Sequence, residues 1–313
     1  MRNVLCALTV LGLSFAASAA AAGPQLGSLQ GGAGITDRNG ATRYVVVSDR
    51  TSSIVEAVRT RGGRLARFVA LDGAWGIPTV TLQGQTGGLS RDGRLLVLSD
   101  ATPPSGTLRT NSTFLVIATN TLTPDQVVEL RGDFAFDALS ADSRTLYLIQ
   151  HVSPTDITSY RVRAYDLAQN RLLPASIADK RQVGWTMSGY PAARATSSDG
   201  RWVYTLYEHT GGYPFVHALD TAGRSAVCIG LPWQQRDDQN ALAHARMRLD
   251  DHELTIAVTG TATRFTLDTR TLRLLRPQRR GTEAFVPGAA AAAVVFLVLA
   301  GLAVRRRRLR TDV

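Results

Sequence analysis

One phrase occurs three times in this sequence, and no other feature constrains the fold of the chain as much. Each copy has small or apolar residues, a Ser-x-Asp turn and then a run rich in Leu, Val and Tyr. Ser90 and Ser140 are 50 residues apart, and Ser140 and Ser197 are 57 apart. Repetition at this spacing is typical of folds in which one small supersecondary unit recurs and packs on its neighbours. The copies are residues 88–98, 138–148 and 195–204.

Weaker copies flank these three. Asp37 to Gly40 precede the run Tyr44 to Val47, and Leu249 to His252 precede Leu254 to Val258. Five units spread over residues 23–285 average about 53 residues each, slightly above the length of a typical propeller blade. The period therefore favours a β-propeller over a helical solenoid.

Each unit contains four short strands separated by turn residues. The Asp-Gly pairs between first and second strands are tight hairpin signals, because both residues tolerate a positive φ. The second strands are almost continuously apolar, which is typical of strands that are buried on both faces. We predict strands at 87–90, 94–99, 113–119 and 126–130 in the second unit, and at 193–197, 202–207, 215–219 and 225–229 in the fourth.

These phrases resemble the bacterial β-propeller superfamily with TolB-like, YVTN-type and lactonase-like repeats. The resemblance covers roughly Ile35 to Pro277 and specifies the architecture, not one activity. It implies an all-β fold, a β-propeller of about five four-stranded blades. Such families usually have six or seven blades, so five units leave open a true five-bladed ring, an incomplete ring closed by a partner, or a further blade without the phrase. A pair of β-sandwiches is the alternative fold.

The N-terminus has the layout of a secretory signal peptide. Arg2 is followed by an apolar run from Val4 to Phe15 and by an alanine-rich tract that ends at Ala22. The short apolar run and the Ala-x-Ala sites favour cleavage near Ala22 over an N-terminal membrane anchor. We expect residues 1–22 to be removed and residues 23–285 to form the extracytoplasmic propeller domain.

The C-terminus has the layout of a membrane anchor. Val286 to Val304 is uncharged and nearly long enough, as a helix, to cross a hydrocarbon core of about 30 Å. Four consecutive arginines follow from Arg305, and such clusters stay on the cytoplasmic side. We therefore expect one transmembrane helix at 286–304, a basic cytoplasmic tail at 305–313 and a single-pass protein of the cell membrane. A buried helix followed by a nucleic-acid-binding tail is the alternative, but nothing else in the sequence supports a nucleic-acid partner.

Charge and cysteine content limit what the outer domain can be. Of the formal charge of +10, about +5 remains on residues 23–285, almost all of it from arginine. This balance is compatible with anionic cell-surface polymers but does not identify one. Cys228 is the one cysteine expected in the mature chain, so no internal disulfide can form there.

Long connections follow the second strands and join one unit to the next, and in a propeller both sets emerge on the same face. Function tends to be carried by elaborated loops on a rigid scaffold. Tryptophans in such loops are either contacts for sugars and protein partners or plugs between blades. The predicted binding face comprises Trp75, Asp100, His151, Trp185, Tyr190, Glu208, His209, Trp233, Arg236 and Asp237.

Polar residues end the second strands at matching places. The metal candidates among them are Asp49, Asp100, His151 and Glu208. If they converged at the channel mouth they could hold Ca²⁺ or Zn²⁺, and Ca²⁺ is the cofactor we consider. The competing interpretation is that they are solvated turn residues and strand-end caps.

Two functions remain open. No Gly-x-Ser-x-Gly elbow occurs, and the phrase that begins at His252 has Ile256 in place of a second histidine. The leading hypothesis is a membrane-anchored, non-catalytic binding or scaffolding module for an extracytoplasmic protein or a cell-surface polymer. The alternative is a metal-dependent propeller hydrolase of lactonase or esterase type. Acidic residues that converge on a divalent ion would favour the enzyme, and a dry or arginine-lined channel would favour the binder.

Overall fold

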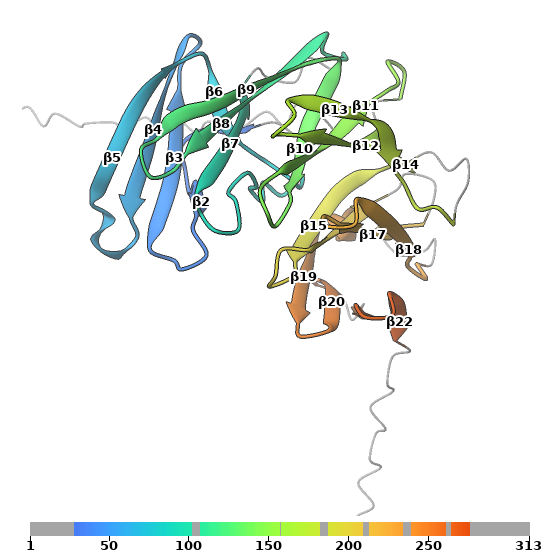
Figure 1. Cartoon of the computed structure of the whole chain (residues 1–313). Coiled ribbons are helices and arrows are strands. Elements are labelled where there is room, and N and C mark those ends of the chain that lie inside the picture. The colour runs from blue at the N-terminus through green and yellow to red at the C-terminus, as the bar shows by residue number, and fades with distance from the viewer. Residues whose placement is uncertain are drawn as a thin grey trace, which may run out of the picture. The chain divides into compact units, whose positions relative to one another are not determined.

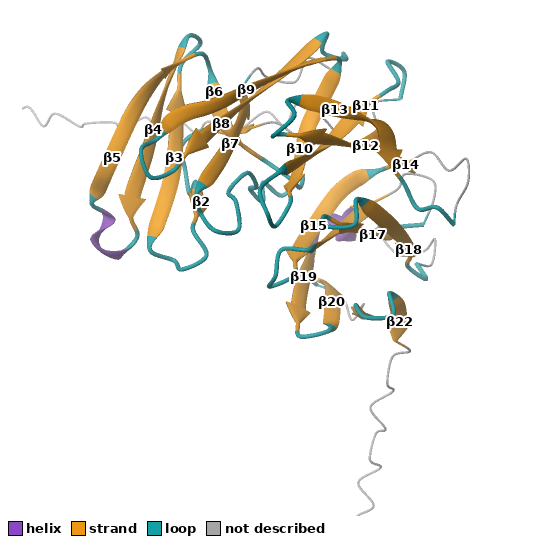
Figure 2. Cartoon of the chain, in the orientation of Figure 1, coloured by secondary structure: helices purple, strands orange, loops and turns teal. Residues whose placement is uncertain are grey.

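A computed structural model describes residues 28–101, 107–156, 158–181, 187–208, 213–233, 239–260 and 264–275. The chain divides into two compact units, Met1–Leu274 and Leu275–Val313, and apart from Leu275 all described residues belong to the first. Strands dominate the described part (Figure 2). Two short 3-10 helices accompany them, η1 (Arg61–Gly63) and η2 (Gln239–His244).

Five antiparallel sheets follow one another along the chain (Figure 1), and we number them Sheet 1 to Sheet 5. Sheet 1 comprises β2 (Ile35–Thr36), β3 (Thr42–Ser48), β4 (Ser52–Arg59) and β5 (Leu65–Asp72). Sheet 2 comprises β1 (Ser28–Leu29), β6 (Trp75–Pro78), β7 (Leu95–Asp100), β8 (Asn111–Ala118) and β9 (Thr123–Arg131). Sheet 3 comprises β10 (Asp133–Leu139), β11 (Thr145–His151), β12 (Ser159–Asp166) and β13 (Arg171–Ile177), and β14 (Met187–Ser188) also pairs with β12. Sheet 4 comprises β15 (Tyr190–Thr196), β16 (Trp202–Glu208), β17 (Phe215–Asp220) and β18 (Ser225–Gly230), and Sheet 5 comprises β19 (Ala245–Asp250), β20 (Glu253–Val258), β21 (Arg264–Asp268) and β22 (Arg273–Leu275).

Each sheet contains a meander of four strands, the unit that the sequence repeat predicts for a propeller blade. The strands expected in the second and fourth units are confirmed to within a few residues, except for the first strand of the second unit. Five separate sheets replace the alternative of two β-sandwiches.

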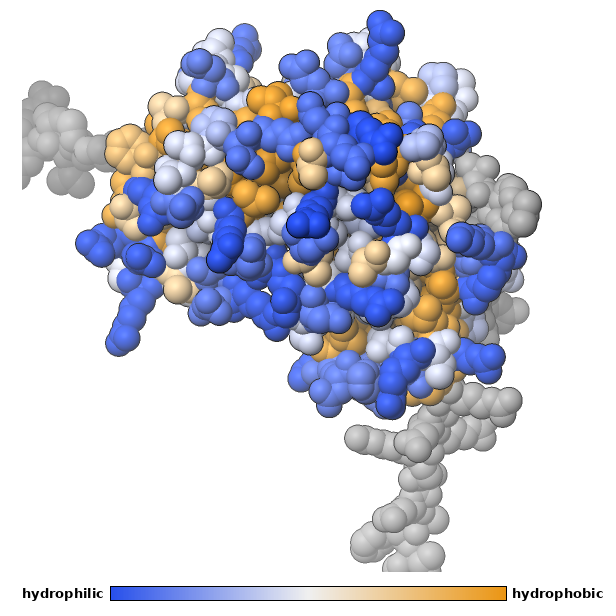
Figure 3. Space-filling view, in the orientation of Figure 1, coloured by the Kyte–Doolittle hydropathy of each residue, from blue (hydrophilic) through white to orange (hydrophobic). Residues whose placement is uncertain are grey.

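Hydrophobic side chains join each sheet to the next. Four buried clusters connect Sheets 1 and 2, 2 and 3, 3 and 4, and 4 and 5. Side chains alternate between the two faces of a strand, so a strand between two neighbouring sheets is buried along its whole length. β11 and β16 show this pattern, as their apolar sequences predict. The face in Figure 3 is mostly hydrophilic, with hydrophobic residues gathered in separate patches.

The Ser-x-Asp phrase forms the hairpin between the first and second strands. In Sheet 3 the Ser140 hydroxyl donates to Asp142, 2.6 Å away, and accepts a hydrogen bond from the backbone N of Thr145 at 2.9 Å. The same two bonds occur from Ser90 in Sheet 2 and from Ser197 in Sheet 4. The serine hydroxyl thus closes the turn, and the aspartate orients that hydroxyl.

The first strand of Sheet 2 differs from the prediction. It begins at Trp75, not at Gly87, and residues 79–86 leave it as a small hairpin before the ladder resumes at Gly88. The backbone N of Gly87 donates to Pro78 O at 2.9 Å across the base of this hairpin. Residues 79–86 are therefore an insertion within the first strand of Sheet 2. We call them the channel hairpin.

In the described part of the chain, no strand pairing and no hydrophobic cluster joins Sheet 5 to Sheet 1. The structure therefore shows the blades but not a closed ring. Within the same residues, no helix has the length and apolar character that crossing a membrane requires. The predicted signal peptide and the predicted transmembrane span at 286–304 lie outside the described residues.

Candidate functional site

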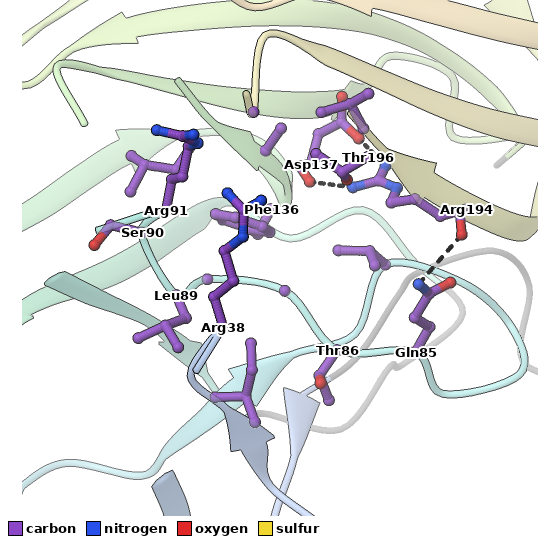
Figure 4. Close-up of a pocket in the computed structure, with 18 of the residues that line it drawn as sticks. Arg38, Gln85, Thr86, Leu89, Ser90, Arg91, Phe136, Asp137, Arg194 and Thr196 are labelled. Carbon is purple, nitrogen blue, oxygen red and sulfur yellow. Dashed lines mark hydrogen bonds and ion pairs between the residues drawn. The ribbon is translucent and has the colours of Figure 1, made fainter. Parts of the chain in front are cut away.

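A cavity of about 450 Å³ lies where the first strands of Sheets 1 to 4 approach one another (Figure 4). Its rim is formed by the tight turns that follow those strands. In each of the four turns, the residue after the first serine or aspartate lines the cavity. These four residues are Arg38, Arg91, Ala141 and Ser198. We call this cavity the channel pocket.

An ion pair lines one side of the channel pocket (Figure 4). Arg194 of β15 pairs with Asp137 of β10, and their side chains are only 7% and 3% exposed. Arg194 also donates from Nη1 to the backbone O of Asp137 and from Nε to Thr205 Oγ1, the latter at 3.0 Å. Buried charges are retained at tolerable cost only when they are paired and hydrogen-bonded in this way. Arg194 and Asp137 therefore neutralise each other and join Sheet 3 to Sheet 4.

Two further arginines lie at the open side of the pocket. Arg38 Nη1 donates to the backbone O of Ser198 at 2.5 Å, and Arg91 Nε donates to the same oxygen at 3.2 Å. Both arginines are exposed, and neither forms an ion pair with a carboxylate in the described part of the chain. Two guanidinium groups from different sheets thus converge on one uncharged acceptor.

The channel hairpin forms part of the pocket wall, through Val80, Gln85 and Thr86. It also forms hydrogen bonds to later parts of the chain. The backbone N of Leu82 donates to Pro191 O at 2.9 Å, and Gln85 Nε2 donates to Arg194 O at 3.3 Å. Gln83 reaches Sheet 5, where its amide donates to Ala245 O at 3.2 Å and to Ala243 O. The insertion therefore ties Sheet 2 to Sheets 4 and 5.

None of the described residues of the predicted binding face lines the channel pocket. Antiparallel geometry explains this, because the tight turns and the long loops lie at opposite ends of the same strands. At the loop end, Trp75 lies opposite Asp100 in the β6–β7 ladder, and Tyr190 lies opposite Glu208 in the β15–β16 ladder. All four are half-buried, and burial raises the pKa of Glu208. The structure thus brings these four together as two cross-strand pairs in Sheets 2 and 4.

His151 occupies the matching place in Sheet 3, opposite Asp133. Its Nδ1 lies 3.3 Å from Asp133 Oδ1, and Arg109 Nη2 donates to the same oxygen at 2.8 Å. Burial by itself raises the pKa of Asp133, but the hydrogen bond from His151 and the charge of Arg109 outweigh it and lower the pKa to about 2. The exposed fraction of the Asp133 side chain is 0%. Asp133, which sequence reasoning missed, therefore anchors Arg109 and His151 and faces no solvent.

Trp233 packs between blades and does not serve as an exposed contact residue, which are the two roles that the sequence allows for a tryptophan in a loop. It is 4% exposed and packs against Phe265 of β21 within the cluster that joins Sheets 4 and 5. It is therefore a plug between blades. Four further members of the predicted face, Trp185, His209, Arg236 and Asp237, lie outside the described residues.

The metal candidates do not form a cluster where the structure describes them. Asp49 accepts hydrogen bonds from the backbone N atoms of Thr51 and Ser52, both at 2.7 Å, and these bonds lower its pKa. Asp49 therefore caps a turn. Among the described residues, no group of three or more His, Cys, Asp or Glu side chains could hold a metal ion.

Arg38 and Arg91 were not singled out from the sequence, although a signal for them exists. In the Ser-x-Asp phrase, serine and aspartate hold the turn together, so the intervening residue is free to point elsewhere. The matching turn in Sheet 1 uses Asp37, which accepts from the backbone N of Ala41 at 2.7 Å and of Thr42 at 3.1 Å. Aligning the four turns marks this intervening position, and in Sheets 1 and 2 it is arginine.

Comparisons with known proteins identify similar folds. No family model matches the chain, and no curated protein matches it. Among solved structures, putative TolB from Agrobacterium tumefaciens is 11% identical, with a TM-score of 0.42 over 79% of this chain and 80% of that chain. The β-propeller domain of Cps50 (Swd1) from Myceliophteria thermophila is also 11% identical, with a TM-score of 0.46 over 79% of this chain and 72% of that one. TolB from Acinetobacter baumannii is 12% identical, with a TM-score of 0.41 over 75% of this chain and 50% of its own.

TolB structures are thus among the neighbours, as the sequence resemblance predicts. The sheets themselves define the class of the protein. A series of four-stranded antiparallel meanders, packed one on the next around an inner row of first strands, is a β-propeller architecture.

Proposed function

We propose that this chain is a membrane-anchored, extracytoplasmic β-propeller that acts as a non-catalytic binding or scaffolding module and takes up its ligand in the channel pocket. The observation that carries the proposal is the set of charged residues in that pocket. Three arginines and one aspartate line it, and the aspartate is already paired with Arg194. An arginine-lined channel is the feature that favours a binder, whereas a metal hydrolase needs acidic side chains directed at a divalent ion.

Anchoring is proposed from the two ends of the chain, both outside the described residues. The expected result is that the full-length protein sediments with membranes and resists extraction by alkaline carbonate. A chain that ends before Val286 should be released, because it lacks the apolar stretch. Replacing the arginines at 305–308 by glutamine, with the stretch left intact, is the matched control and should leave the protein in the membrane fraction. Release of the full-length protein by carbonate would contradict the anchor.

The binding role is tested on the full-length chain purified from its source cells in a mild detergent. Native mass spectrometry should detect a bound ligand on the wild-type protein. Thr196 is exposed and lines the pocket, so Thr196→Trp should fill the pocket and abolish that bound mass. Thr123→Trp, on the exposed outer strand β9, is the matched control and should retain it. The proposal fails if the wild-type chain carries nothing or if Thr196→Trp keeps the ligand.

Elemental analysis separates this proposal from the hydrolase. We expect no stoichiometric divalent ion on the full-length chain and no change in its melting temperature when Ca²⁺ is added or chelated. A stoichiometric Ca²⁺ or Zn²⁺ whose removal lowers the melting temperature would favour the hydrolase instead, because a ligand that binds only the folded state stabilises it.

A further inference from the structure

We infer that the channel pocket is a site for small organic anions, in which a carboxylate or phosphate group lies between Arg38 and Arg91 and an apolar moiety packs against Phe136. The inference rests on the proposed function, because it names the ligand class for the same pocket. Figure 4 shows Arg38 and Arg91 beside Phe136, and Arg194 paired with Asp137 on the other side of the pocket.

Rigid turns hold the two arginines in place. Arg38 lies between Asp37, whose carboxylate accepts two backbone hydrogen bonds, and Gly40, whose N donates to Asp37 O at 2.9 Å. Arg91 lies between Ser90 and Asp92, whose side chains bond to each other at 2.7 Å. Little backbone freedom is therefore lost when an anion binds, which favours affinity.

Among the described residues, no carboxylate forms an ion pair with either of these arginines. Arg38 and Arg91 both bond to a carbonyl oxygen that carries no formal charge, and the carboxylate of Asp137 is used by Arg194. Asp37 and Asp92 are next to these arginines in the sequence, and Asp199 lies near Arg91, but each of these carboxylates is hydrogen-bonded within its own turn. The pKa of Asp199 is lowered chiefly by the hydrogen bond from Ser197, and the charge of Arg91 contributes least. An anion between the two guanidinium groups would relieve their mutual repulsion, and both groups have donors left for it.

The rest of the pocket suits an anion with an apolar part. Phe136 and Val80 are 4% and 1% exposed and form apolar wall, while Ser90, Thr196 and Ser198 add polar groups near the rim. A volume of about 450 Å³ is near the lower end of the range for small-molecule pockets. One small molecule fits such a space, and a folded partner does not.

The test uses ligands of one shape and different charge. Phenyl phosphate and benzoate are the anions, benzamide is the neutral counterpart of benzoate, benzamidine is the cation, and inorganic phosphate lacks the apolar part. Binding to the full-length chain in a non-ionic detergent is followed by calorimetry and by saturation-transfer NMR. We expect both aromatic anions to bind at millimolar concentrations or below, inorganic phosphate to bind more weakly, and benzamide and benzamidine not to bind.

Variants locate the site. Arg38→Gln combined with Arg91→Gln should weaken binding of phenyl phosphate by about tenfold or more, because both charge-assisted hydrogen bonds are lost. Arg64→Gln combined with Arg94→Gln removes the same charge from exposed residues outside the pocket and should leave affinity unchanged. Added salt should weaken binding to the wild type.

Three results would overturn the inference: equal binding of benzamide and benzoate, unchanged affinity in the Arg38 and Arg91 double variant, or no binding of either aromatic anion. The proposed function is decided separately by the Thr196→Trp experiment, which does not depend on ligand charge. If a co-purifying ligand is lost in Thr196→Trp but the anions fail, the pocket binds and the ligand class assigned here is wrong.

Discussion

His217 in β17 is buried, with 1% of its surface exposed, in the interior of Sheet 4. Its Nδ1 lies 3.6 Å from the sulfur of Cys228, a buried free cysteine, and the edge of its ring faces Tyr207. Its Nε2 has no hydrogen-bond partner among the described residues. Burial penalises the charged imidazolium and lowers the pKa of His217 to about 4, from an ordinary value of 6.5.

This residue makes stability depend on pH. Between about pH 6.5 and 4 the unfolded chain binds a proton at residue 217 that the folded chain does not bind. The free energy of unfolding should therefore fall as the pH falls through that window, by about 3 kcal/mol at most. Denaturant titrations of the full-length chain at several pH values measure it. Asp133 and Asp179, with pKa values of about 2, begin to lose their contributions below about pH 5 and add to the fall at the acid end of this window.

His217→Phe should reduce the loss of stability between pH 6.5 and 4, since no proton can then bind at this position. His244→Phe is the matched control, because His244 is exposed, and it should keep the full pH dependence. Identical pH profiles for the wild type and His217→Phe would contradict the assignment.

The turn phrase recurs as a hairpin in Sheets 2, 3 and 4, and the residue after its aspartate has a positive φ in each. Gly93 and Gly200 occupy this place with φ of 71° and 75°, whereas Sheet 3 has Ser143 with φ of 60°. A side chain is strained in this region and glycine is not. The Ser143 hydroxyl is also buried without a hydrogen-bond partner among the described residues.

Ser143→Gly should therefore stabilise the protein by about 1 kcal/mol, because it removes both the strain and the unpaired hydroxyl at some cost in chain entropy. Thermal and denaturant unfolding of the full-length chain measure the change. Ser143→Ala separates the two contributions, since it removes the hydroxyl and keeps the positive φ, and it should stabilise less than glycine. A loss of stability in Ser143→Gly would mean that the serine makes a contact that the turn geometry does not reveal.

The sequence predicts most of the strands and turns well. The turn phrase marks the first hairpin of a blade, and the apolar run behind it marks the buried second strand. The channel hairpin escapes prediction because nothing local distinguishes it from a connection between blades. Its stability comes from bonds to Pro191 and Arg194, which are more than a hundred residues away in sequence. The pocket could not be predicted for the same reason. Arg38 and Arg91 bond to Ser198, which is 160 and 107 residues away in the sequence.

In the whole molecule, the two terminal sheets differ from those between them. Strands β4 of Sheet 1 and β20 of Sheet 5 alternate between buried and exposed residues, whereas β11 and β16 are almost wholly buried. The free face of Sheet 5 is polar, with exposed Arg246, Arg248 and Arg264. The face of Sheet 1 that points away from Sheet 2 has exposed apolar residues, since Val47, Ile54 and Phe68 are 51%, 43% and 64% exposed. Glu56 lies among them, and Val45 and Val58 on the same face are buried. Because these two faces do not match, an open series of sheets is the expected state of the single chain.

Replacing Ile54 and Phe68 together by threonine tests whether the free face of Sheet 1 is open. If it is, the two side chains lose little burial, and the free energy of unfolding should change by no more than about 1 kcal/mol. Val55 lies on the opposite face of the same strand, is 0% exposed and belongs to the cluster shared with Sheet 2. Val55→Thr is the matched control. It should lower the free energy of unfolding by about 1 to 3 kcal/mol, because it buries a hydroxyl that has no hydrogen-bond partner. A loss of several kcal/mol in the double variant would show that this face is covered in the folded protein, either by Sheet 5 in a closed ring or by a second molecule.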